Sequence, residues 1–271
     1  MAATILVGID SSTPSRSALI WSVRRAVAEG AALELLHVID SEGVDRDSAE
    51  WHELRETAAL LLRTELLFAR ELAPTLSITT NLADGRAEDA LVRRSSGHSL
   101  LVVGTHKTGF IYGRTFGSRF LGLAWRARCD VAFIPDQVGS THHGVVAGFD
   151  TSPAGEAILR FAAAEAAAGD RELTLVSSWS TRRAPRGAAL EAQRAALTRA
   201  VELLHASHPD LRVHSRSVEL PVAEALIEAA ANASLLVIGR PRRPWSSTVS
   251  RASNHDILVN MACPVIVVWA G

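Results

Sequence analysis

Short apolar runs alternate with amphipathic segments along the whole chain. In the first half, the apolar runs occupy residues 4–9, 33–38, 75–80, 99–103 and 130–134. Between them, apolar residues recur three and four positions apart, the spacing of one helix face, over 14–29, 46–72, 86–95 and 116–127. Short apolar strands that alternate with helices are typical of a parallel sheet covered on both faces. The pattern therefore predicts an α/β fold.

The second half repeats the first. Ile-Leu-Val-Gly-Ile-Asp at 5–10 matches Val-Val-Ala-Gly-Phe-Asp at 145–150, and Leu-Val-Val-Gly at 101–104 matches Leu-Val-Ile-Gly at 236–239. The offset of about 135–140 residues is the size of one ordinary domain. Further apolar runs fall at 144–149, 172–177, 211–218, 234–238 and 264–269, with helical segments at 153–168, 187–207, 221–231 and 249–260.

Right-handed crossovers between such strands predict a doubly wound, Rossmann-like sheet of five parallel strands in each half. We expect two domains, 1–137 and 143–271, joined by the short polar segment 137–143 and packed as a pseudo-dimer. The last strands, 130–134 and 264–269, lie at sheet edges in this topology and need to be covered. Association of the chain into a homo-oligomer through these edge strands is therefore expected.

Composition narrows the class of protein. The chain is 48% hydrophobic and 21% charged, with a formal net charge of −1 and no polybasic block, so we expect neither a nucleic-acid partner nor a membrane partner. The N-terminal residues lack the pattern of a signal peptide, and a cytoplasmic location is expected. Cys129 and Cys263 occupy the same place in each half and are expected to be small buried apolar residues.

Ligands of doubly wound sheets bind beyond the carboxyl ends of the strands, and Asp10 follows the first strand there. Ser12 or Thr13 is suited to cap the next helix, with Pro14 in its first turn. Asp10 is also placed to bond a ribose hydroxyl or a cation at the rim of a ligand, and the two interpretations are compatible. At the end of the second strand, backbone groups could pair with the edge of a base, whereas His37 is expected to be a packing or surface residue.

A glycine-rich segment, residues 104–118, follows the fourth strand and carries most of the information about function. Glycine lets the backbone approach a ligand closely, and N–H groups at a helix start favour anions. Lys107 adds positive charge, and the Ser118 hydroxyl is a further donor to phosphate. The alternative is a surface loop without a ligand. Asp84-Gly85-Arg86 is expected to form a turn, and no Ser-His-Asp or paired-carboxylate active site is visible.

These motifs resemble the universal stress protein family, in tandem form, over nearly the whole chain. Gly104, Gly117 and Ser118 match its nucleotide signature of Gly, two residues, Gly, nine residues, Gly-Ser/Thr, and Asp10 with Ser12 matches its opening element. The resemblance implies that ATP, accompanied by Mg²⁺, places its phosphates on the glycine loop and its base beside Asp10 and the backbone of Val38.

Departures from the signature differ between the halves. Lys107 replaces the middle glycine in the first half, which narrows the room for phosphate but adds an ammonium group. In the second half, Arg242 stands at that position between two prolines, and the terminal glycine is missing. Proline removes backbone donors. Although Asp150 persists, we expect the second half not to bind ATP in the family's usual manner.

Three functions are compatible with these observations. We favour a stress-response protein that binds ATP or a related adenine nucleotide in its N-terminal domain and acts as a sensor or regulator. The alternative is a scaffold or adaptor that acts through a protein partner still unknown. An enzyme for phosphoryl or adenylyl transfer is least favoured, because no nucleophile, base or metal cluster is evident, and at most weak ATPase activity is expected.

Overall fold

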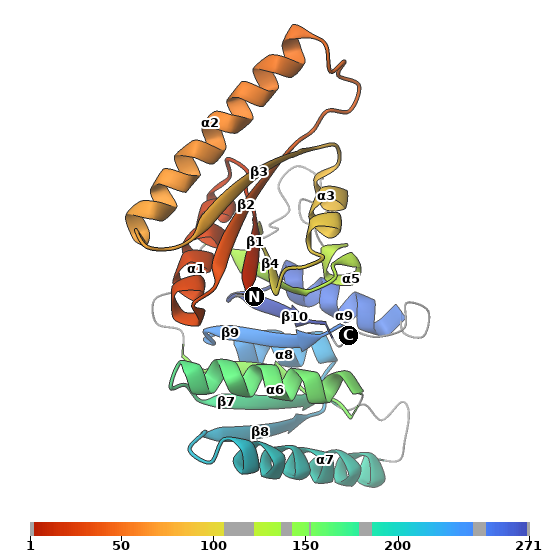
Figure 1. Ribbon diagram of the computed structural model, residues 1–271. Coiled ribbons are helices and arrows are strands. Elements are labelled where there is room, and N and C mark those ends of the chain that lie inside the picture. The colour runs from red at the N-terminus through yellow and green to blue at the C-terminus, as the bar shows by residue number, and fades with distance from the viewer. Residues whose placement is uncertain are drawn as a thin grey trace. The chain divides into compact units, whose positions relative to one another are not determined.

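A computed structural model describes residues 3–105, 122–136, 143–151, 153–178, 186–240 and 248–269 (Figure 1). Contacts divide the chain into two units, residues 1–137 and 138–271, and each is described by itself. Most of the predicted linker lies outside the described residues, and the packing of the two halves stays a prediction. Among the described helices, none is long and apolar enough to cross a membrane.

The first unit is a parallel sheet with helices on both faces. Its strands have the order β3-β2-β1-β4-β5, and every neighbouring pair is parallel. Helices α1 and α2 pack on one face, and α3 and α5 pack on the other (Figure 1). The elements are β1 Thr4–Gly8, α1 Thr13–Glu29, β2 Ala32–Ile39, α2 Ala49–Leu72, β3 Ile78–Asp84, α3 Ala87–Arg94, β4 Leu100–Thr105, α5 Leu123–Arg126 and β5 Asp130–Pro135.

The second unit repeats this topology with the order β10-β9-β6-β7-β8, again with parallel neighbours. Helices α6 and α7 cover one face, and α8 with α9 lies on the other. The elements are β6 Val145–Gly148, α6 Pro153–Ala168, β7 Leu173–Ser178, α7 Arg186–Ser207, β8 Val213–Val218, α8 Val222–Ala230, β9 Leu235–Gly239, α9 Thr248–Val259 and β10 Val265–Val268. The predicted doubly wound α/β fold is thus confirmed in both units.

Central strands form the core of each unit. Ile5, Leu6 and Val7 of β1 are fully buried, as are Ala147 of β6 and Val237 of β9. Burial on both faces explains why these strands are continuous apolar runs rather than alternating ones. In the first unit, β1 lies between β2 and β4, and the helices that lead into these two strands, α1 and α3, pack on opposite faces of the sheet. This switch point opens a crevice beyond the carboxyl ends of the strands.

The third strand corrects the sequence-based expectation. An apolar run predicted it at 75–80, whereas β3 spans Ile78–Asp84. Leu76 instead belongs to the turn after α2, where its N–H donates to the Ala73 carbonyl at 3.2 Å. Because β3 is an edge strand with exposed threonines, it needs no apolar run, and hydropathy placed it too early. Asp84 accordingly ends the strand, and Gly85, at φ 100°, makes the turn.

Candidate functional site

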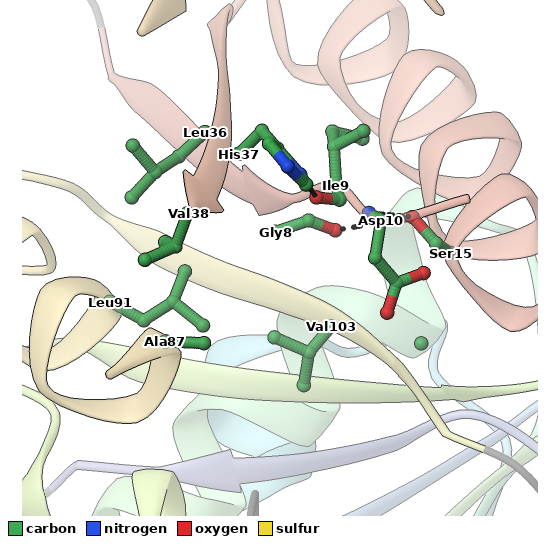
Figure 2. Close-up of a pocket in the computed structure, with 11 residues that line it drawn as sticks. Gly8, Ile9, Asp10, Ser15, Leu36, His37, Val38, Ala87, Leu91 and Val103 are labelled. Atoms are coloured by element: carbon green, nitrogen blue, oxygen red, sulfur yellow. Dashed lines mark hydrogen bonds between the residues drawn. The ribbon is translucent and has the colours of Figure 1, made fainter. Parts of the chain in front are cut away.

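A pocket lies at the switch point of the first unit, beyond the ends of β1, β2 and β4 (Figure 2). Its volume is about 470 Å³ when the open solvent at its mouth is included. Asp10, Val38 and Gly104, three of the residues predicted from the sequence, all line it. The full lining is Gly8, Ile9, Asp10, Ser15, Leu36, His37, Val38, Ala87, Leu91, Val103 and Gly104.

The turn from β1 into α1 holds Asp10 in place. Its Oδ1 accepts the Ser12 N–H at 2.9 Å, and the Ser12 hydroxyl accepts the Ser15 N–H at 3.3 Å. Ser12 is therefore the N-cap of α1, with the extended dihedrals that such a cap requires. The capped helix start and the position of Asp10 at the pocket occur together. Ser12 itself is not among the described lining residues, so its contact with a ligand stays a prediction.

Ser15 is a site residue to which sequence reasoning assigned no contact. Its hydroxyl accepts the Asp10 N–H at 3.0 Å and lies 3.5 Å from the Gly8 carbonyl oxygen, to which it donates. The side chain is buried. It thus replaces the hydrogen bonds that the chain loses where β1 ends. The signal in the sequence that could have identified Ser15 is its position three residues after Ser12, the serine that caps α1.

The hydrogen-bond ladder between β1 and β2 stops at the pocket. The Ile9 N–H donates to the Leu36 carbonyl at 2.8 Å, and the Ile9 carbonyl is bonded to Nδ1 of His37 at 2.7 Å. Successive residues of a strand direct their N–H and C=O groups to opposite neighbours. Because the main-chain groups of Leu36 are directed to β1, those of Val38, two residues further on, are directed to the same side. The main-chain groups of Val38 are therefore directed toward the pocket, beyond the end of β1.

Gly104 is a glycine for a packing reason. A Cβ at this position would lie 2.2 Å from the carbonyl carbon of Pro14 and 2.5 Å from the amide nitrogen of Ser15. Real Cβ atoms do not approach backbone so closely. The first turn of α1 therefore lies directly against the end of β4, and this contact needs residue 104 to have no side chain.

Apolar side chains form one wall of the pocket. Leu36 and Val38 come from β2, Ala87 and Leu91 from α3, and Val103 from β4 (Figure 2). Asp10 and Ser15 supply the polar groups on the other side. An apolar wall with a few convergent polar groups suits a flat aromatic ligand with a polar edge.

The remaining predicted residues, Lys107, Gly117 and Ser118, lie outside the described residues, so the phosphate end of the predicted site is not part of this geometry. Within the described part of the chain, no group of three or more His, Cys, Asp or Glu side chains could hold a metal ion.

The second unit differs at the corresponding turn. Gly155, five residues after Asp150, takes the place of Ser15, and a Cβ there would lie 2.1 Å from the Asp150 carbonyl oxygen. Position 155 therefore has no room for a side chain, so the residue that corresponds to Ser15 cannot carry a hydroxyl here. Further along the sheet, the Asn254 amide donates to the Gly239 carbonyl at 3.4 Å, and burial lowers the pKa of Arg240.

A family model and curated relatives identify the family to which this chain is similar. The model of the universal stress protein family matches residues 1–135 and again 142–268. A universal stress protein of Mycobacterium tuberculosis is 27% identical over 275 residues, covering 98% of this chain and 96% of the relative. One of Mycolicibacterium smegmatis is 27% identical over 282 residues, covering 97% and 96%. The crystal structure of a universal stress protein from Archaeoglobus fulgidus superposes with a TM-score of 0.79 at 17% identity, covering 99% of this chain and 98% of that one, which shows the shared fold.

Proposed function

Because the chain belongs to the universal stress protein family in both of its halves, we propose that it is a stress-response protein whose first unit binds an adenine nucleotide. Binding there makes it a sensor or regulator rather than an enzyme. The observation that carries the proposal is the switch-point pocket, in which apolar walls and the main chain of Val38 meet the Asp10 carboxylate. A cytoplasmic location and association into a homo-oligomer belong to the same proposal.

The described residues fit the nucleoside part of such a ligand. A purine ring can lie against Leu91 and Val103, with its polar edge toward the peptide groups of Val38. Asp10, already oriented by the Ser12 N–H, is suited to accept hydrogen bonds from ribose hydroxyls. The phosphates would be bound by the segment that contains Lys107 and Ser118, and Mg²⁺ would accompany them as their counter-ion.

The second unit is not proposed as a nucleotide site. In its β6–α6 turn, Gly155 takes the place of Ser15 and has no room for a side chain. Arg242 with two prolines replaces the glycine signature. A single nucleotide per chain is therefore expected.

Calorimetric titration of ATP with Mg²⁺ into the full chain tests this proposal. We expect one site per chain, which Asp10→Asn abolishes and the matched variant Asp150→Asn leaves unchanged. Equal losses from both variants would contradict a single site. Absence of both heat and a thermal shift at millimolar ATP would refute nucleotide binding and favour a scaffold that acts through a protein partner.

Lys107 decides how the phosphates are held. If its side chain blocks the phosphate path, Lys107→Gly strengthens ATP binding, and if its ammonium clamps the phosphates, the same variant weakens it. Adenosine, which lacks phosphates, is the control ligand, and its affinity should not change in either case.

A further inference from the structure

We propose that His37 is a positioning residue, which keeps the main-chain N–H and C=O of Val38 available to the edge of a ligand's base. It does so by occupying the carbonyl oxygen with which the Val38 N–H would otherwise pair. The identity of the ligand rests on the proposed function, whereas the hydrogen-bond arrangement is a property of the protein alone.

The bond from His37 lies where the β1–β2 ladder would continue. In a parallel ladder, a residue that donates to one carbonyl of its neighbour accepts from the N–H two residues further on. Ile9 donates to Leu36 at 2.8 Å, so its carbonyl is the partner expected for the Val38 N–H. That carbonyl instead lies 2.7 Å from Nδ1 of His37 (Figure 2).

The opposite side of β2 is consistent with this assignment. The Ile39 carbonyl accepts the Gly85 N–H at 3.0 Å, beyond the end of β3. Ile39 therefore faces β3, and Val38, its neighbour in sequence, faces β1. Since β1 ends at Gly8, both polar groups of Val38 are directed to the pocket that Val38 lines.

The chemistry of the bond determines the tautomer. A carbonyl oxygen only accepts, so Nδ1 of His37 carries a hydrogen and donates it. The neutral ring then has its lone pair on Nε2. Since Nδ1 is also protonated in the imidazolium form, this bond persists whether or not the ring is charged.

A free donor and a free acceptor on the same residue suit one edge of a 6-aminopurine. Its ring nitrogen N1 accepts from an N–H, and its exocyclic amine donates to a carbonyl. A 6-oxopurine presents a donor and an acceptor in the reverse order. A site built to hydrogen-bond one pattern disfavours the other, because its own polar groups are then left unpaired. Discrimination between adenine and hypoxanthine is therefore expected to depend on His37.

The second unit has a different arrangement at this position. The strand registers, Gly8 with Leu36 and Gly148 with Val176, place Ser177 where the first unit has His37. The Ser177 hydroxyl accepts from Nε2 of Gln193 at 2.5 Å, and Oε1 of Gln193 accepts from Ser217 at 2.9 Å. The Ser177 side chain is thus hydrogen-bonded to Gln193 of helix α7.

Amide hydrogen exchange at Val38, followed by NMR in the full chain, tests the inference without a ligand. The test variant is His37→Leu, which has no donor, and the matched control is His37→Asn, whose amide can donate from nearly the place of Nδ1. We expect rapid exchange at Val38 in the wild type and in His37→Asn, and exchange at least tenfold slower in His37→Leu. ATP should slow the exchange in the first two proteins.

Calorimetry with ATP and ITP supplies the second measurement. The wild type and His37→Asn should prefer ATP, whereas His37→Leu should bind ATP about tenfold more weakly and lose the preference. Slow exchange at Val38 in the ligand-free wild type would overturn the inference, even if His37→Leu failed to fold. Equal exchange at Val38 in wild type and His37→Leu would overturn it as well. The expected exchange pattern without binding of either nucleotide would support the positioning role and refute the proposed function.

Discussion

A Cβ built on Gly104 would lie 2.3 Å from the carbonyl oxygen of Pro14. The end of β4 and the first turn of α1 therefore touch through their backbones. Gly104 is also the first glycine of the motif that resembles a nucleotide signature. Its presence is explained by packing alone, so it indicates the fold more directly than it indicates a ligand.

Gly104→Ala is expected to destabilise the first unit by about 3 kcal/mol, because backbone atoms, unlike side-chain ends, cannot move aside. Unfolding in denaturant measures this change in the free energy of unfolding. The control is Gly8→Ala, whose Cβ would meet side-chain atoms of Val103 and Leu91 at 3.3 and 3.4 Å. It should lower the free energy of unfolding by about 1 kcal/mol or less and weaken nucleotide binding by filling the pocket. Equal destabilisation by the two variants would contradict the assignment of Gly104 to backbone packing.

Ser15→Ala is expected to cost about 1–3 kcal/mol of stability, since it leaves the Asp10 N–H without its acceptor. Exchange of the Asp10 amide, measured by NMR, should become faster. Ser11→Ala, which changes an exposed side chain in the same turn, is the control and should have no effect on either measurement. An unchanged Asp10 exchange rate in Ser15→Ala would show that the hydroxyl does not bridge the turn.

A buried carboxylate on β2 should make the first unit sensitive to acid. Glu34 is bonded by Nε of Arg94 at 2.5 Å and lies 3.2 Å from Nε2 of His98. Burial alone would raise the pKa of Glu34, but the hydrogen bonds and charge of Arg94, with the contribution of His98, lower it below its ordinary 4.5. A lowered pKa in the folded state means that the stabilisation is present above pH 4.5 and is lost as the pH falls through the folded-state value.

Arg94→Met tests this ion pair. It leaves the Glu34 carboxylate buried without its main partner and should cost about 1–3 kcal/mol at pH 7. The loss of stability between pH 5 and pH 3 should become shallower than in the wild type. The double variant Glu34→Gln/Arg94→Met should recover part of the loss at neutral pH. An identical pH dependence in wild type and Arg94→Met would show that Glu34 does not contribute to acid sensitivity.

The two cysteines should be unreactive in the folded protein. Burial raises the pKa of Cys129 to about 12, with the Asp130 charge adding to the effect, and burial raises the pKa of Cys263 to about 12. Since the thiolate is the reactive form, a thiol reagent at pH 8 should find no fast-reacting group in the native protein and both groups in denaturant. Rapid native labelling of Cys129 or Cys263 would contradict their buried position.

The fold was predictable because central strands and helices leave strong periodic signals. The apolar run at 4–9 and the structure's β1 differ by a single residue, and the helix predicted over 153–168 coincides with α6. The signal failed at β3, where an edge strand is exposed and Leu76, in the preceding turn, drew the prediction too early. Hydropathy reports burial, so it locates strands only where they are buried.

The site was predictable in part, for a similar reason. Asp10 and Gly104 were identified because residues that follow the apolar runs must lie at the carboxyl edge of the sheet. His37 was expected to be a packing or surface residue, yet it lines the pocket and bonds Ile9. Its contact depends on β1 ending before β2 does, and strand ends are the least certain feature of a sequence pattern.

The extension of β2 past the end of β1 has a consequence for how this protein can vary. Every amino acid except proline supplies the same N–H and C=O at position 38, so mutation there leaves that edge of the pocket intact. The base, which distinguishes one nucleotide from another, would then be recognised by main-chain atoms of residue 38, and the encoded side chain of His37 would keep those atoms available. The phosphates, which all nucleotides share, would depend on encoded side chains such as Lys107. Substitution at position 38 would therefore leave the choice of base unchanged, whereas substitution of His37 would alter it.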